Sequence, residues 1–522
     1  MKIFKYRAFA VLSLGLFAAA TWSACTDLEP LSPGQTIEAT SSGGELPLPD
    51  DPAGVLESVR QGLNDFTDQG QMYALMEHTS DELMGPTRGT DWSDFGVWRQ
   101  LHAHTWDPFN QQIQNAFNNL ARRYFNATQV IAASDDAALT AEAQFLRAFF
   151  MSYMVDFFGQ VPFREATEGF GTNPRVMTRV EATNMVIADL EAAINGLPSY
   201  DGNAGVATRE AAQALLARVL LNKAVYVADN PAGPYNFEAA DMDRVISLAD
   251  EVMSNGNLAI QEAGSYFEMF GPENTTESSE NIFALVYEPN DGIGGGVQNR
   301  QHMTTHYNQE VSGWNGFTTI ADFYNKWDQN DERFSADSPQ PDQYGLRRGF
   351  LQGQQFKMEN GEQVALTDRS GNPLEFTVDV DLFYSNERMG VRVMKYYPDF
   401  DNGLFEQNND YPLMRVGELV LNKAEAQLRK GDEGAAVATL NTLLANRAGT
   451  TPVSSLNEQT LLDHRGFEMY WEGFRRMDQI RCSDFLTAWT EKDYESPSHV
   501  TIFPIPQNQV DANPNLNQNP GY

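Results

Sequence analysis

Cysteine is nearly absent from this sequence: among 522 residues, only Cys25 and Cys482 carry a thiol. Two thiols allow at most one disulfide, so the fold cannot depend on a framework of covalent cross-links. Long apolar runs are missing as well, because no stretch approaches the roughly 18 consecutive apolar residues that a membrane-spanning helix needs. The chain therefore has to bury a core of its own, and its 42% hydrophobic and 20% charged residues suit a globular protein.

Basic residues are scarce. Lys and Arg number 36 against 71 Asp and Glu, which gives a formal net charge of −35. Such a surface repels the phosphate backbone of nucleic acids, so we expect no nucleic-acid partner. It also repels anionic lipids, so attachment to a membrane would need an anchor other than a basic face.

Sequence signatures of catalysis and of metal binding are missing too. The chain contains no G-x-S-x-G, no G-x-G-x-x-G and no P-loop. His302 and His306 have the i, i+4 spacing of zinc ligands, and His102 and His104 lie close together, but neither pair has an HExxH context or an obvious third ligand. The sequence therefore predicts neither a metal site nor a cofactor.

The N-terminal residues have the layout of a lipoprotein signal. Basic residues precede Ala8–Ala20, an apolar run of 13 residues that is too short to span a bilayer. Small residues then precede Cys25, as in the lipobox of bacterial lipoproteins, although Trp22 occupies the position where a lipobox usually has leucine. We predict a signal peptide over 1–24, a lipid on Cys25, which would attach the chain to a membrane, and a flexible tether over 25–50 that is rich in Ser, Gly, Pro and Thr. The alternatives are an ordinary cysteine after a cleaved signal, or a disulfide to the second cysteine.

Helices dominate the remainder of the chain. Apolar residues recur at helical spacing in several segments, and capping residues or glycines flank many of them. The predicted helices span residues 107–133, 140–159, 179–196, 208–227, 241–254, 412–430, 433–447 and 457–480. We expect a mainly α fold in which a helical scaffold (51–255) and C-terminal helices with a tail (411–522) flank a loop-rich insert (256–410) with short β-strands, such as 282–287 and 376–380.

Several segments, in order along the chain, resemble the SusD/RagB family. Each is moderately specific, and their ordered combination covers residues 25–522. The similar segments are Ala141–Ala148 (AEAQFLRA) with Phe158–Pro162 (FGQVP), Ala214–Val219 (ALLARV), Tyr411–Arg415 (YPLMR), the set Arg465, Glu468, Glu472, Gly473, Arg475 and Asp478, and the tail Phe503–Pro506 (FPIP) with Asn513–Tyr522.

This resemblance implies a fold and a function. The fold would be a right-handed scaffold of tetratricopeptide-like helix pairs that supports a loop-rich ligand face, with 51–522 as one SusD-like domain. The protein would be a nutrient-binding lipoprotein of the outer membrane, facing the outside and acting as the lid of a SusC-like TonB-dependent transporter. It would bind oligosaccharides, or peptides as in some members of the family, and would not be an enzyme.

Two carboxylates in the late helix allow a different function. Glu468 and Glu472 share one helix face, and a glycoside hydrolase uses such a pair. Arginines at 465, 475 and 476 flank the pair, and they would lower the pKa of a carboxylate that must act as an acid. We therefore favour a structural ion-pair network, with an α-helical glycosidase as the alternative.

Two loops supply the candidate ligand-binding residues. Glycan sites combine exposed aromatic faces with polar side chains that bind hydroxyl groups. The polar segment 85–106 offers Asp91, Trp92, Trp98 and Arg99. In the insert, Trp314 and Asn315 lie between two glycines and form a second candidate platform. The alternative for Trp98, and for Trp106 in the same segment, is packing at the start of the following helix.

Overall fold

The computed structural model describes residues 44–272, 274, 278–287, 296–400 and 407–522. The predicted signal peptide, Cys25 and most of the predicted tether lie outside these residues. Contacts divide the chain into two units, and one of them comprises Leu46–Glu168 and Asn173–Tyr522. The description below concerns this unit. No helix in the described ranges is both long and apolar enough to cross a membrane.

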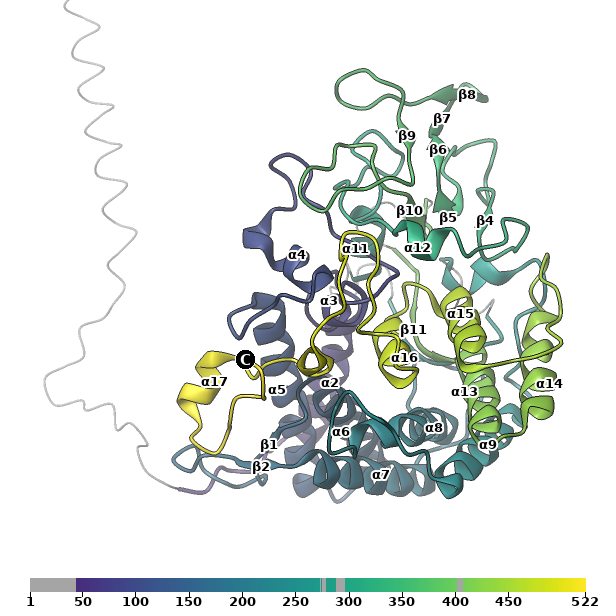
Figure 1. Cartoon of the computed structure of the whole chain (residues 1–522). Helices are drawn as coiled ribbons and strands as arrows, with labels where there is room; N and C mark the ends of the chain where they lie inside the picture. Colours follow the sequence, from purple (N-terminus) through teal and green to yellow (C-terminus); the bar gives the residue numbers. More distant parts are fainter. Residues whose placement is uncertain (1–43, 273, 275–277, 288–295, 401–406) are drawn as a thin grey trace, which may run out of the picture. The chain divides into compact units, whose positions relative to one another are not determined.

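The N-terminal half of this unit is helical, and each long helix packs against the next along the chain (Figure 1). The helices after residue 107 agree with the predicted ranges to within four residues, whereas the earlier helices had no predicted range. The helices of this half are α2 (Pro52–Gln61), η1 (Gly62–Phe66), α3 (Gln71–Glu77), η2 (Asp94–Gly96), α4 (Val97–His102), α5 (Gln111–Ala133), α6 (Ala137–Phe158), α7 (Arg179–Gly196), α8 (Arg209–Tyr226) and α9 (Ala239–Met253).

Local capping explains where these helices begin. The Asp136 carboxylate accepts the free N–H groups at the start of α6, and Thr178 forms a capping box with Glu181 at the start of α7. The predicted start of α5 at 107 is wrong by four residues. The Asp107 side chain bonds the N–H of Phe109 within a turn, and Asn110 caps α5 instead.

Aromatic packing around α6 fills the centre of the helical block. This helix lies between α5 and α7, and most of its side chains are buried. Phe66 packs against Phe149 and Tyr153 at ring-centroid distances of 5.2 and 4.6 Å. Since burying one such side chain contributes about 1.5–3 kcal/mol, α6 is the main hydrophobic anchor of the block.

The C-terminal helices differ from the prediction in two places. They are α13 (Val416–Arg429), α14 (Glu433–Leu444), α15 (Glu458–Met469), α16 (Arg475–Arg481), η4 (Ser498–Thr501) and α17 (Gln507–Ala512). Residues 412–415, predicted as helix, belong to the strand β11 (Tyr411–Arg415), which pairs antiparallel with β3 (Asn281–Leu285). The predicted single helix over 457–480 is broken after Met469.

Buried carboxylates hold this helix break open. Trp471 and Gly473 have left-handed φ values of 59° and 90°, which end α15. Glu82 accepts the N–H of Trp471 at 3.2 Å, and Glu77 accepts the N–H of Gly473 at 2.5 Å. Glu77 is the last residue of α3 and Glu82 follows this helix, some 390 residues away in sequence, so local periodicity could not reveal the break.

The insert consists of loops with short strands, which lie at the top of Figure 1 above the helical block. Of the predicted run 376–380, only residue 376 is in a strand. The remaining elements are β1 (Val161–Phe163), β2 (Arg175–Met177), η3 (Tyr266–Phe270), α11 (Gly296–His302), α12 (Ala321–Tyr324), β4 (Ser335–Ala336), β5 (Arg348–Leu351), β6 (Gly353–Gln354), β7 (Phe356–Glu359), β8 (Glu362–Ala365), β9 (Glu375–Phe376) and β10 (Arg392–Met394). They pair as β1–β2, β10–β5–β4, β6–β9 and β7–β8.

A cluster of buried charges joins the insert to the C-terminal helices. We call it the buried ion cluster, and its members are Glu280, Asp331, Arg333, Lys395, Arg415, Arg447, Glu468 and Glu472. Arg415 pairs with Glu468 at 2.6 Å and with Glu472 at 2.8 Å. Arg447 bridges Glu280 and Glu468 at 2.6 and 2.7 Å. The cluster balances four cations against four carboxylates, so its charges are compensated inside the protein.

The chemistry of Glu468 does not fit a glycosidase acid. Its side chain is 0% exposed and lies among Arg333, Arg415 and Arg447. Burial raises the pKa of this carboxyl, but the charges of Arg447 and Arg415 outweigh it and hold the pKa well below its usual range. A carboxylate that is enclosed and ionised supports the ion-pair interpretation of Glu468 and Glu472 over the catalytic one.

Replacing Glu468 by Gln removes a charge that three arginines share. We expect the free energy of unfolding to fall by about 3–5 kcal/mol, because the buried guanidinium groups lose their counter-ion. Chemical denaturation followed by circular dichroism measures the change. The matched control is Asp250→Asn, which breaks an exposed pair with Lys423 and should cost less than about 1 kcal/mol. A Glu468→Gln variant as stable as this control would show that the cluster does not hold the insert in place.

Candidate functional site

Two loops from distant parts of the chain meet beside α4. Met84 and Thr318 form an antiparallel bridge with N···O distances of 2.8 and 3.0 Å, which fixes the end of one loop against the end of the other. The second loop is closed by the N–H of Gly316, which donates to the carbonyl of Met303 at 2.8 Å. This arrangement brings together Trp92 and Trp314, two of the residues predicted to bind ligand.

The two loops line a hollow of about 820 Å³, which we call the first hollow. Its size is in the range of ligand sites in proteins. The residues around it are Gln69, Thr90, Asp91, Trp92, Asp94, Phe95, Val97, Trp98, Gln111, Gln112, Tyr307 and Trp314. Aromatic rings and hydrogen-bonding groups therefore share one open surface.

Trp92 is held in a fixed position at the first hollow. Its Nε1 donates to the carbonyl oxygen of Trp314 at 2.9 Å, and its ring lies 4.8 Å from Phe317 and 6.4 Å from Trp314. A Cβ at Gly316 would lie 2.4 Å from the Trp92 ring, so only glycine allows this approach. Trp92 is half-buried and Trp314 is 39% exposed, which leaves ring surface available on both.

Trp98 and Asn315 are both buried, but only Trp98 lines the first hollow. Trp98 is buried, and its Nε1 donates to Asp94 at 2.6 Å. The ring of the buried His78 stacks on Trp98 at 4.9 Å. Asn315 is fully buried, and its amide bonds Arg392 and the carbonyl of Glu387. Trp98 thus forms a buried part of the wall of the hollow, whereas Asn315 holds the loop that carries Trp314.

Arg99 and Trp106 point elsewhere. The Arg99 guanidinium bonds the Thr87 hydroxyl and lies 5.3 Å from the centre of the Phe383 ring. It does not line the first hollow. Trp106 is buried, and its Nε1 donates to the Tyr522 hydroxyl at 2.8 Å. For Trp106, core packing is therefore what the structure shows.

A chain of polar contacts surrounds Asp91, and the sequence did not single out its partners. The Tyr307 hydroxyl donates to Asp91 at 2.7 Å, and Arg369 lies 3.4 Å from the same oxygen. Burial, together with the bond to Asp91, raises the pKa of Tyr307 to about 12, so the hydroxyl stays a donor at neutral pH. Tyr307 lies in the same loop as Trp314, and this proximity was the one feature of the sequence that could have pointed to Tyr307 as a site residue.

Backbone strain is concentrated at the first hollow. Trp92, Asp94, Phe95 and Asn315 all have left-handed φ values, between 31° and 59°. Such conformations are costly for residues other than glycine and tend to occur where a side chain is held for a purpose. One result is that the Phe95 ring is fully exposed at the rim. The strain makes these loops a candidate functional surface.

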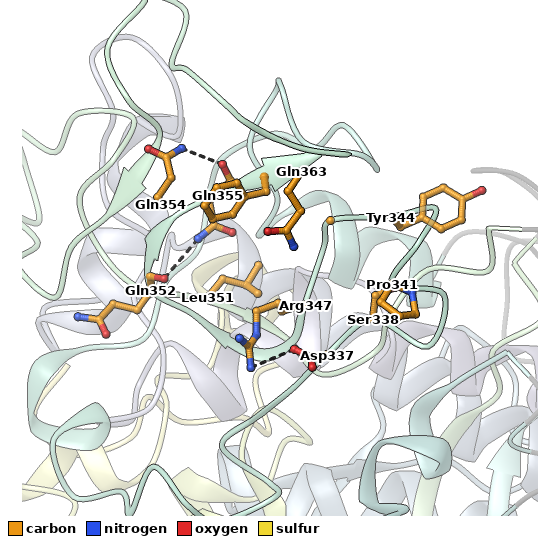
Figure 2. A pocket seen from close by; sticks show the side chains of 12 residues that line it. Asp337, Ser338, Pro341, Tyr344, Arg347, Leu351, Gln352, Gln354, Gln355 and Gln363 are labelled. Atoms are coloured by element: carbon orange, nitrogen blue, oxygen red, sulfur yellow. Dashed lines mark hydrogen bonds and ion pairs between the residues drawn. The ribbon is translucent and has the colours of Figure 1, made fainter. Parts of the chain in front are cut away.

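Two other hollows lie in the insert. The second hollow, of about 630 Å³, shares Thr90 and Asp91 with the first. The third hollow, of about 320 Å³, is lined by four glutamines and by the ion pair of Arg347 and Asp337 (Figure 2). The Gln354 and Gln355 amides there bond backbone carbonyls of the strand loops. No indole lines the third hollow, so the first hollow is the better candidate for the main site.

The histidine pair of the insert is engaged within the protein. His302 packs on Trp314 at a ring-centroid distance of 5.1 Å, and His306 bonds Glu387 at 3.0 Å. Burial lowers the pKa of both imidazoles. Within the described ranges, no three histidine, cysteine or acidic side chains converge as a metal site would require.

Comparison with known proteins gives two family matches. The model described as the SusD family matches residues 252–522. A second model, described as "Starch-binding associating with outer membrane", matches residues 50–209. The two matches follow one another along the chain, as the ordered motifs do.

Individual proteins are similar over most of the chain. The starch-binding protein SusD of Bacteroides thetaiotaomicron is 24% identical over 476 residues, which span 81% of either chain. A SusD superfamily structure from Parabacteroides distasonis has a TM-score of 0.69 at 17% identity and covers 91% of this chain and 100% of that one. A SusD-like carbohydrate-binding protein from Bacteroides fragilis has a TM-score of 0.66 at 19% identity, with 90% and 98% covered. These structures confirm the predicted mainly α fold of tetratricopeptide-like helix pairs.

Adding one methyl group at Gly316 should displace the Trp92 ring. In Gly316→Ala, the new Cβ would meet Trp92 at 2.4 Å and the Met303 carbonyl at 2.8 Å. We expect a changed tryptophan emission and a loss of about 1–3 kcal/mol in stability from overpacking. Fluorescence and denaturation measure the two effects. Gly256→Ala, where the Cβ meets nothing within 4 Å, is the control. If Gly316→Ala still changes the tryptophan emission when it is made in a Trp92→Phe background, the displaced ring is not Trp92.

Proposed function

Because this chain belongs to the SusD family, we propose that it is a cell-surface lipoprotein that binds oligosaccharides and delivers them to a TonB-dependent outer-membrane transporter. The observation that carries the proposal is the pair of accessible indoles, Trp92 and Trp314, at the rim of one open hollow. Sugar rings present apolar C–H faces that stack on aromatic rings.

The polar groups of the first hollow complement these aromatic faces. Asp91 and Asp94 can accept hydrogen bonds from sugar hydroxyl groups, and the glutamines at 69, 111 and 112 offer both donors and acceptors. No lysine or arginine lines the first hollow, which suits a neutral glycan. A few polar groups around apolar walls are typical of sites that bind small ligands.

The carboxylates at this hollow support capture rather than hydrolysis. Asp91 accepts from Tyr307 and pairs with Arg369, and Asp94 accepts from the indole of Trp98. These contacts use the carboxylates to hold the loops. Glu468 and Glu472, the pair considered for a glycosidase, belong instead to the buried ion cluster.

The relatives support a carbohydrate ligand. The curated relative is described as starch-binding, and one structure that covers 91% of this chain is described as a laminarin-binding SusD-like protein. We therefore favour a glycan over a peptide. The family description "associating with outer membrane" supports an outer-membrane location. A lipid on Cys25 would provide the anchor, with the 25–50 tether between the membrane and the domain, and the SusC-like transporter would be the partner.

Removing either indole should weaken glycan binding. We expect Trp92→Ala and Trp314→Ala each to lower affinity about 10-fold or more, since a stacked aromatic ring contributes on the order of 1.4 kcal/mol or more. Electrophoresis in native gels that contain starch or laminarin measures retention. Tyr494→Ala removes an exposed aromatic ring that lines none of the three hollows and is the control.

Three outcomes would count against this proposal. Full retention of the double variant would place the ligand elsewhere. A peptide that co-purifies with the protein, identified by mass spectrometry, would replace the glycan as ligand. Reducing sugar released by the wild-type protein but not by Glu472→Gln would make the protein an enzyme.

Labelling in cells tests the anchor. We expect wild-type protein to incorporate radioactive palmitate and to partition with outer membranes, because lipid chains on Cys25 would supply the attachment that an acidic surface cannot. Cys25→Ala should lose the label and the membrane association, whereas Cys482→Ala should keep both. An unlabelled wild-type protein would contradict the lipoprotein assignment.

A further inference from the structure

The second hollow continues the surface of the first. Both are lined by Thr90 and Asp91, which form the ridge between them. The residues that line the second hollow beyond this ridge come from the segments 368–372 and 383–388, with Arg88 and Gly89. None of them is among the residues that the sequence pointed to. A ligand longer than the first hollow would meet the second one next.

Two neighbouring aromatic rings stand exposed at the second hollow. Phe383 is 53% exposed and Tyr384 is 83% exposed. Single exposed aromatics are common on proteins and need no explanation. Here two adjacent rings line the same hollow, and the exposed Phe95 lines the neighbouring one. Rings in this arrangement offer a platform for further sugar units.

A tight turn presents this aromatic pair. The Asp381 carboxylate accepts the N–H groups of Phe383 and Tyr384, both at 2.8 Å. The Ser385 hydroxyl closes the turn, since it donates to the Asp381 carbonyl at 2.7 Å. The turn is therefore ordered before any ligand arrives, which lowers the entropic cost of binding on it.

Arg88 couples the walls of the two hollows. Its buried guanidinium donates to the Gly316 carbonyl at 3.1 Å, in the loop of the first hollow. It also donates to the carbonyls of Asn386 and Met389, at 2.6 and 2.8 Å, in the loop of the second. One rigid side chain thus fixes the distance between Trp314 and the aromatic turn, and the two platforms act as one surface.

We propose that the second hollow is an extension of the ligand site, in which distal units of the same oligosaccharide stack on Phe383 and Tyr384. Arg388 lines the same hollow and pairs with Asp368 through its Nε at 3.3 Å, and its other guanidinium nitrogens supply donors for the hydroxyl groups of these units. This inference rests on the proposed function and makes it more specific. The ligand is a chain of several sugar units, long enough to cross the ridge at Thr90 and Asp91, rather than a mono- or disaccharide.

Chain length is the variable that tests this inference. Isothermal titration calorimetry with malto-oligosaccharides and laminari-oligosaccharides, from disaccharide to heptasaccharide, measures affinity against length. We expect wild-type affinity to rise with length in the series that binds. In the Phe383→Ala/Tyr384→Ala variant, affinity for the longest chains should fall about 10-fold, and affinity for the shortest chains that bind should stay within about 2-fold.

Control variants separate the two hollows. Trp92→Ala should lower the affinity for short and long chains alike, because every chain uses the first hollow. Tyr494→Ala should change neither, and thermal unfolding checks that each variant is folded. The extension site is overturned if Phe383→Ala/Tyr384→Ala binds long chains as tightly as wild type does, or if it lowers the affinity for short and long chains equally. Either result leaves the proposed function intact. If the wild-type protein binds no oligosaccharide of either series, the proposed function fails and the extension site fails with it.

Discussion

The buried ion cluster is the constraint on which the rest of this structure depends. Arg415 is the last residue of β11, and its guanidinium pairs with carboxylates of α15 and of the break after it. Arg333 and Lys395 bring two segments of the insert to the same carboxylates. Charges removed from water are tolerated only when each finds its partner, so the insert has one permitted position on the helices. The position of the insert determines where its loops lie and therefore where the hollows form.

The strained backbone of these loops is stabilised by the rigid helical frame that they pack on. Left-handed backbone at Trp92, Phe95 and Asn315 would relax in a free loop, but the Met84–Thr318 bridge and the bonds of Arg88 hold these segments from both sides. Buried rings of Trp98, His78 and Phe317 then support the exposed ones. Aromatic surface therefore stays exposed at these loops instead of being buried in the core.

Much of the helical frame could be predicted from local pattern, because caps and apolar spacing act within a few residues. Asp136 and Thr178 start their helices as such residues should, and α7 spans the predicted residues. The errors arose where distant groups intervene. Glu77 and Glu82 break the late helix from the far end of the sequence, and β3 draws residues 411–415 into a strand. The distant partners cannot be read from the sequence nearby, although Gly473 is itself a local signal for a helix break.

The sequence alone determined the class of the molecule: acidic, mainly helical, poor in cysteine, and similar to one family through ordered motifs. It also predicted Trp92 and Trp314 as ligand-binding residues, because tryptophans in glycine-containing polar loops are candidate platforms for sugar rings. Only the tertiary structure decided that these residues, 222 positions apart, share one hollow, that Trp98 lines it while being buried, and that Asn315 does not line it. The structure alone also placed Tyr307, Arg369 and the turn at Phe383 beside the hollows. The reason is physical: residue type and spacing encode contacts within a turn or two, whereas the meeting of loops follows from how the whole frame packs.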